Sequence, residues 1–157
     1  MTLNAIIIII FLCLIMLIAI FYRNSTLDRL ELLPGESLLF EEKGVKVEQA
    51  GAPSTAVFIG CIVRVTNARI IIAQKMLFRE RYALRHVIIY GGGEDAADLK
   101  NILSRGYIEM KVDRASIKLE QSGSGVRVTI PVPDTALTRG QYITWQSSLT
   151  GDYYRLK

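Results

Sequence analysis

The sequence predicts a mainly β (α+β) fold, in which an N-terminal transmembrane helix precedes an antiparallel sheet with a C-terminal capping helix. Three observations support this prediction. The chain opens with a continuous apolar segment, its middle is rich in β-branched residues bounded by Gly and Pro, and its end has apolar residues at helical spacing. After the apolar segment, the 157-residue chain has room for one ordinary domain.

The segment Leu3 to Tyr22 predicts a membrane span, because it is apolar except for Asn4 near its start. About 20 residues rising 1.5 Å each cover the roughly 30 Å of bilayer hydrocarbon. A cleaved secretory signal is the alternative, but no Lys or Arg precedes the segment and no small-residue cleavage site ends it. Arg23 and Arg29 follow the segment, and this charge bias predicts a single-pass protein whose C-terminal domain is cytoplasmic.

The chain is expected to have three parts. Residues 1–23 form the transmembrane anchor, residues 24–34 a linker and residues 35–157 the domain. The linker carries leucines at helical spacing and is closed by a Pro-Gly pair, which predicts a short connector that ends where the domain begins.

The first half of the domain predicts short strands separated by turn residues. The expected strands are Ser37–Glu42, Val45–Gln49, Ala56–Thr66, Arg69–Lys75 and one or two within Leu77–Tyr90. Lys43-Gly44 has the composition of a hairpin turn between the first two strands, and Asn67-Ala68 has that of a tight turn between the next two. Gly91-Gly92-Gly93 then interrupts the sheet.

The second half predicts two helices with strands between them. Asp95–Ser104 has acidic residues in its first turn and an apolar face, which is typical of a helix. The expected strands are Tyr107–Val112, Ser116–Gln121 and Val126–Val132. A final helix is expected over Arg139–Leu149, because Thr138 and Gln141 have the capping-box spacing and Tyr142, Trp145 and Leu149 share one stripe.

Two motifs suggest a family. The segment Leu33-Pro34-Gly35-Glu36 opens the domain, and Thr66-Asn67-Ala68-Arg69 ends one apolar strand and begins the next. This order resembles the GRAM and bacterial pleckstrin-homology-like domains. The resemblance implies an antiparallel sheet against which a C-terminal helix packs a Trp, here Trp145, and it implies binding of a protein or a lipid headgroup.

The residues Thr66, Asn67 and Arg69 also have a purely structural interpretation. Asn tolerates a left-handed backbone and bonds within its own turn, so the motif is mainly a device for a hairpin. Headgroup recognition by the same corner is the alternative. Glu41 and Glu42 oppose it, because these carboxylates lie where an anionic phosphoinositide would have to approach in the related domains.

The sequence offers no catalytic residue, cofactor site or metal site. His86 is the only histidine and lies in a strand-like segment, where a partly exposed strand residue is expected rather than a general base or metal ligand. Cys13 and Cys61 lack the partners and spacing that zinc requires. No nucleophile can be paired with a base, so an enzyme is not expected.

The densest basic stretch contains Arg79, Arg81 and Arg85, which predict a solvated strand face or a contact for an acidic protein partner or an anionic lipid. A formal net charge of +4 is too small and too dispersed to indicate nucleic-acid binding. We therefore expect a non-enzymatic membrane protein that presents an interaction module. A structural subunit of a larger membrane complex is the alternative.

Overall fold

The computed structural model of the protein describes residues 3–23, 26–52, 55–77, 79–91, 106–133, 139–148 and 154. These residues form one N-terminal α-helix, two short 3₁₀ helices and eight strands. The helices are α1 (Leu3–Arg23), η1 (Leu27–Arg29) and η2 (Arg114–Ser116). The strands are β1 (Leu38–Ala52), β2 (Ala56–Thr66), β3 (Arg69–Lys75), β4 (Tyr82–Tyr90), β5 (Ile108–Val112), β6 (Lys118–Ser122), β7 (Gly125–Pro131) and β8 (Arg139–Ser147).

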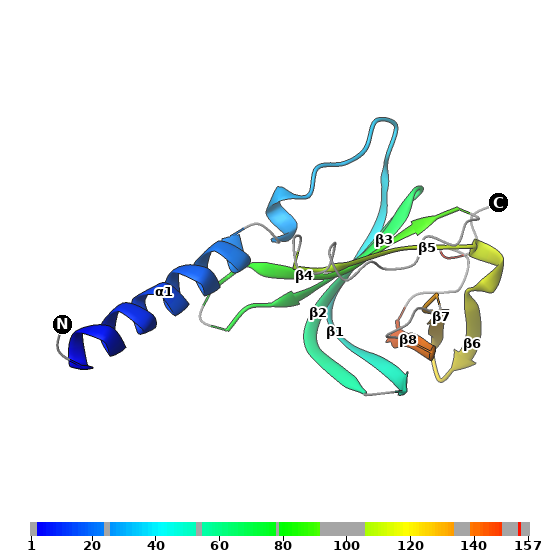
Figure 1. The fold of residues 1–157 in the computed structure, drawn as a ribbon. Coiled ribbons are helices and arrows are strands. Elements are labelled where there is room, and N and C mark those ends of the chain that lie inside the picture. The colour runs from blue at the N-terminus through cyan, green and yellow to red at the C-terminus, as the bar shows by residue number, and fades with distance from the viewer. Residues whose placement is uncertain are drawn as a thin grey trace.

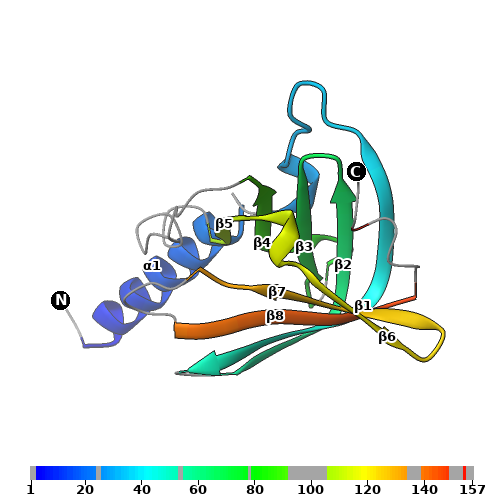
Figure 2. The ribbon, with the colours of Figure 1, turned by 90° about the vertical axis from the view of Figure 1, so that its right-hand side faces the viewer.

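All eight strands belong to one sheet, in the order β5-β4-β3-β2-β1-β8-β7-β6. Neighbouring strands are antiparallel, except that β4 and β5 run parallel. The sheet curls into a half-barrel, and α1 projects away from one end of it (Figures 1 and 2). The molecule is therefore mainly β.

Strand β1 corrects one sequence prediction, because Lys43-Gly44 does not form a hairpin turn. The two predicted strands on either side are one continuous strand, Leu38–Ala52, which pairs along its length with β2. Gly44 has a φ of 74°, and the pairing register shifts between Lys43 and Val45. A glycine at positive φ in a paired strand produces a bulge and a bend rather than a reversal.

Strands β2 and β3 have the bounds predicted from their β-branched composition, and the Asn67-Ala68 turn joins them. Strands β4 to β7 lie within the predicted strand regions or shifted from them by one or two residues at an end. The predicted helix Asp95–Ser104 lies outside the described residues.

The predicted C-terminal capping helix is wrong, because Arg139–Ser147 is the strand β8, inserted between β1 and β7. Every second side chain of β8 is buried, including Ile143 and Trp145, whereas Tyr142 is 45% exposed. This two-residue period is that of a half-buried strand, and the sheet provides partners on both sides. The spacing of Tyr142 and Trp145 fitted a helical stripe, but in β8 their side chains lie on opposite faces.

The predicted transmembrane anchor is also corrected, since no helix within the described residues has both the length and the apolar content needed to cross a bilayer. The large apolar side chains described in α1 are nevertheless exposed, and they are Ile6, Ile7, Ile8, Ile9, Ile10, Phe11, Leu12, Leu14, Ile15, Met16, Leu17 and Ile18.

The sheet buries apolar side chains on both faces. The larger cluster fills the inside of the curl with buried residues from every strand except β6, among them Ile70, Ile72 and Trp145. Alternate residues of the same strands point outward, where Ile71 packs with Leu27 of η1 in a second, smaller cluster. The connector η1 is thus docked on the outer face of β2, β3 and β4.

Candidate functional site

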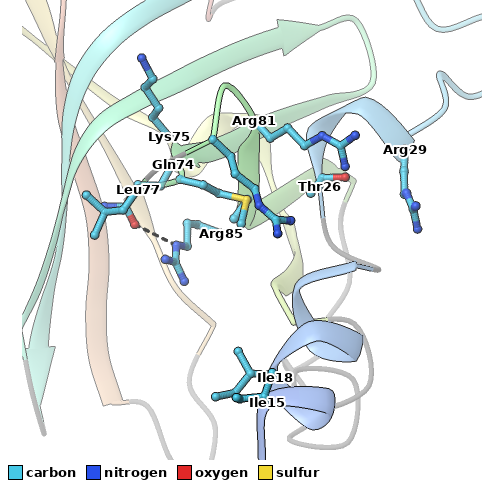
Figure 3. A pocket seen from close by; sticks show the side chains of 12 residues that line it. Ile15, Ile18, Thr26, Arg29, Gln74, Lys75, Leu77, Arg81 and Arg85 are labelled. Carbon is cyan, nitrogen blue, oxygen red and sulfur yellow. Dashed lines mark hydrogen bonds between the residues drawn. The ribbon is translucent and has the colours of Figure 1, made fainter. Parts of the chain in front are cut away.

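A pocket of about 860 Å³ lies between α1 and the hairpin formed by β3 and β4. Ile15 and Ile18 line it on the helix side (Figure 3). The end of β3, the β3–β4 turn and the start of β4 line it on the sheet side, and Thr26 and Arg29 of the connector complete it. We call this space the basic pocket.

Five of its 12 described lining residues are basic and none of them is acidic. The basic residues are Arg29, Lys75, Arg79, Arg81 and Arg85. The three arginines that the sequence suggested as contacts are therefore gathered in one place. They do not share one strand face, because Arg79 and Arg81 precede β4 and only Arg85 belongs to it.

The local structure explains why these side chains meet. Met76 donates a backbone hydrogen bond of 2.8 Å to the carbonyl of Arg81, which closes the turn and brings both of its ends to the pocket. The first half of β4 extends beyond the strand β5, and Thr26 forms a β-bridge with Ala83 there. Burial of Leu27 against the sheet then brings Arg29 to the same site.

Arg85 is the most constrained of the five cations. Its Nε donates a hydrogen bond of 3.1 Å to Oε1 of Gln74 on β3, and its guanidinium lies 5.4 Å from the centre of the Phe58 ring. A hydrogen bond and a cation–π contact together fix the orientation of the guanidinium group. Figure 3 shows this group on the side of the pocket that faces Ile15 and Ile18, whereas Lys75 points away from them.

The positive charge of the pocket is weakly compensated. Arg81 has an acidic neighbour, Asp28, but the nearest nitrogen and oxygen are 4.0 Å apart and both side chains are more than half exposed. Arg29, Arg79 and Arg85 form no ion pair with any described residue. Such an excess of cations attracts anions.

The opposite end of β3 carries a buried ion pair. Arg69 donates to Glu36 through Nε (2.8 Å to Oε1) and through an Nη2 bond of 2.9 Å to Oε2, and it also donates to the carbonyl of Glu31. Thr66 donates to the same carboxylate at 2.6 Å. We call these three side chains, Glu36, Thr66 and Arg69, the Glu36 cluster.

Burial by itself would raise the pKa of Glu36, but hydrogen bonds from Arg69, Thr66 and the Leu33 amide and the charge of Arg69 outweigh it, so the pKa is lowered. Asn67 adds to the same contact: its Oδ1 accepts from the amide of Ser37 and its Nδ2 donates to the carbonyl of Gly35. The motif residues therefore attach the start of the domain to the β2–β3 turn. This is a wider structural role than shaping one hairpin.

The carboxylates Glu41 and Glu42 of β1 are also engaged within the fold. Glu41 accepts from Arg64 at 2.6 Å, and Glu42 accepts from the hydroxyl of Ser147 at 2.8 Å. They hold β1 against β2 and β8.

His86 lies in a strand as predicted, but it is only 1% exposed, so the expectation of partial exposure is wrong. Its Nε2 is 3.0 Å from Oε1 of Gln49, whose amide donates to Gln141, while Nδ1 has no hydrogen-bond partner. Burial, helped by the nearby charge of Arg85, lowers the pKa of His86 to about 4. Within the described residues, no group of three His, Cys, Asp or Glu side chains is placed to hold a metal ion.

Trp145 packs inside the curl rather than under a helix. It is 2% exposed, and its indole nitrogen donates to the hydroxyl of Tyr154 at 3.2 Å. The ring of Tyr154 also makes an edge-to-face contact with Phe40. Trp145 therefore anchors β8 and the C-terminal Tyr154 to the core.

Sequence reasoning missed Arg29 and Lys75 as pocket residues and Glu36 as the partner of Arg69. Only the folded chain brings Arg29 to the hairpin, whereas Glu36 and Arg69 both lie in the motifs that suggested a family.

The chain matches no protein-family model, no curated protein and no solved structure. A curled sheet alone does not identify a GRAM domain, so that resemblance stays a prediction.

Proposed function

We propose that this protein is a non-enzymatic interaction module that associates with a lipid bilayer through α1 and holds its sheet domain near anionic headgroups through the basic pocket. One observation carries the proposal. Five basic side chains and two apolar side chains of α1 line the same space. An apolar helix surface adjoining a cationic surface matches the boundary between acyl chains and charged headgroups.

The exposed surface of α1 supports the first part of the proposal. A helix that is apolar all round requires an apolar environment, which water cannot provide. Lipid acyl chains supply such an environment. A second protein is the other candidate, because helices of a larger membrane complex could cover the same side chains.

The position of the cations supports the second part. Each basic side chain near an anionic leaflet contributes about 1 kcal/mol of attraction, and salt screens this attraction over a Debye length. Anionic lipid is characteristic of the cytoplasmic leaflet.

Hydrogen–deuterium exchange of the full chain in nanodiscs tests the proposal. We expect slower exchange at the β3–β4 hairpin in nanodiscs containing phosphatidylglycerol than in pure phosphatidylcholine. High salt, or substitution of Arg79, Arg81 and Arg85 by Ser, should remove this difference. A control with the same loss of charge replaces Lys43, Lys118 and Arg127, which are exposed on β1, β6 and β7, by Ser and should retain it.

Two results would contradict the proposal. One is identical exchange of the hairpin in both lipid compositions. The other is purification in mild detergent with a stoichiometric protein that itself protects the hairpin, which would favour the subunit of a membrane complex.

A further inference from the structure

The size of the basic pocket sets the first limit on what it can bind. Its volume of about 860 Å³ lies in the upper part of the range of ligand pockets, roughly 300–1,000 Å³. An inorganic anion would leave most of this space to water. A ligand that fills it must have a substantial part besides its charged group.

The lining sets the second limit, because it is divided into two chemical halves. Arg79, Arg81 and Arg85 belong to the hairpin side, whereas Ile15 and Ile18 belong to α1. In Figure 3 the guanidinium of Arg85 and the two isoleucines lie across one space from each other. A complementary ligand carries an anionic group at one end and a hydrocarbon part at the other.

Arg85 indicates which anionic group is suitable. Its Nε donates to Gln74 and its guanidinium lies over the ring of Phe58, while its terminal nitrogens form no hydrogen bond with another described residue. A guanidinium held in this way presents a fixed fork, and forks of this kind recognise phosphate oxygens through paired hydrogen bonds. Arg79 and Arg81 add charge at the same side.

The apolar side continues onto the hairpin. Leu77, in the turn after β3, is 84% exposed although it lines the pocket together with Ile15 and Ile18. Hydrocarbon placed between Leu77 and α1 would shield both surfaces from water.

We propose that the basic pocket binds a single anionic phospholipid, with its phosphate on Arg79, Arg81 and Arg85 and the start of its acyl chains against Ile15, Ile18 and Leu77. This proposal rests on the proposed function and makes it more specific. Attraction to a negatively charged membrane requires only a surface with dispersed positive charge. A bound phospholipid requires one molecule held with defined stoichiometry.

Native mass spectrometry of the full chain, delipidated in detergent and then supplied with defined lipids, tests the proposal. We expect one phosphatidylglycerol per chain to be retained, and phosphatidylcholine to be retained at least roughly tenfold more weakly because its net charge is zero. Arg85→Gln should weaken retention of phosphatidylglycerol by roughly tenfold, whereas Lys118→Gln on β6 should leave it unchanged.

A soluble probe separates a phospholipid site from a plain phosphate site. Glycerophosphoglycerol carries the same phosphodiester without acyl chains and should bind far more weakly than phosphatidylglycerol. Leu77→Ser keeps every charge, and it should weaken binding of phosphatidylglycerol without affecting binding of glycerophosphoglycerol.

Each opposite outcome overturns the inference. Equal binding of glycerophosphoglycerol and phosphatidylglycerol would show a site for the headgroup alone. Absence of a retained lipid, combined with hairpin protection in anionic nanodiscs, would reject the single-lipid site and leave the proposed function standing. If no lipid is retained and the hairpin is not protected in anionic nanodiscs, the single-lipid site and the proposed function are both rejected.

Discussion

The two ends of strand β3 use arginine in opposite ways. At the Arg69 end the guanidinium side chain is 6% exposed and pairs with a carboxylate whose side chain is fully buried. At the Lys75 end, several cations line a pocket in which none of the described lining side chains is acidic. Where the fold supplies a buried carboxylate, arginine stabilises the structure; where it supplies none, arginine is available to an outside anion.

The largest effect is expected from breaking the paired end. Arg69→Ala leaves the Glu36 carboxylate buried without its partner, which should lower the free energy of unfolding by roughly 3–5 kcal/mol. Arg79→Ala at the other end should change it by less than about 0.5 kcal/mol. Urea unfolding of the full chain in detergent, followed by fluorescence of the single Trp145, measures both. Equal stabilities of the two variants would remove the distinction between the ends.

Acid should lower the stability of the protein, and the contributions of Glu36 and His86 should be lost in different pH ranges. The pKa of Glu36 is lowered in the folded state, so its contribution is complete above about pH 4.5 and is lost as the pH falls further. His86 also has a lowered pKa, about 4 instead of 6.5, so the unfolded state takes up its proton first. The stability that neutral His86 contributes, on the order of 3 kcal/mol, is therefore lost between pH 6.5 and 4.

The variant His86→Gln separates these two contributions. Its stability should stay level from pH 6.5 to 4.5 and decline only below that, whereas the wild type should decline throughout. Urea midpoints measured across this pH range provide the comparison. A wild-type stability that stays constant between pH 7 and 5 would show that His86 does not titrate as a buried group.

A smaller effect is expected from Asn67→Ala, which removes the side-chain hydrogen bond that Asn67 accepts from Ser37 and the one that it donates to Gly35 but keeps the buried ion pair. The expected loss of stability is about 1–2 kcal/mol. Gln121→Ala on the edge strand β6 serves as the control. If Asn67→Ala behaves like that control, the side chain of Asn67 is not needed to hold the domain start on the β2–β3 turn.

The smallest change in stability is expected when a carboxylate is introduced at the Lys75 end of β3, so that this end resembles the Arg69 end. Gln74→Glu places a carboxylate where Arg85 already donates at 3.1 Å. We expect a change in stability below about 1 kcal/mol and a loss of about 1 kcal/mol in attraction to anionic lipid. Hairpin exchange in anionic nanodiscs reports the second effect, with Gln121→Glu as the charge-matched control. Unchanged protection in Gln74→Glu would mean that Arg85 does not contact the lipid.

The strands that local composition determines were predictable. Ala56–Thr66 and Arg69–Lys75 combine β-branched residues with a turn-forming Asn, and each of these signals is contained in a few neighbouring residues. The bend at Gly44 was not predictable, because a glycine at positive φ permits both a turn and a bulge. The partner strand decides between them.

The errors at Arg139–Ser147 and in the N-terminal span have different causes. In β8, spacing that suits a helix also suited a strand once β1 and β7 were present to pair with it. Helical structure in α1 was predictable from its apolar run, but no helix within the described residues is both long and apolar enough to cross a membrane. The basic pocket was foreseen only through Arg79, Arg81 and Arg85, since tertiary contacts bring Arg29 and Lys75 to them.

The strand order also bears on how the chain folds. β1 to β4 form one set of sequential neighbours and β6 to β8 another, and the pairing of β1 with β8 joins residues as distant as Val47 and Trp145. Closing so long a loop costs chain entropy before any contact repays it, so we expect this pairing to form late. Ile143→Val should then mainly accelerate unfolding in stopped-flow experiments, whereas Ile71→Val should slow refolding. The reverse pattern would mean that the distant strands join first and that the sheet grows outward from its centre.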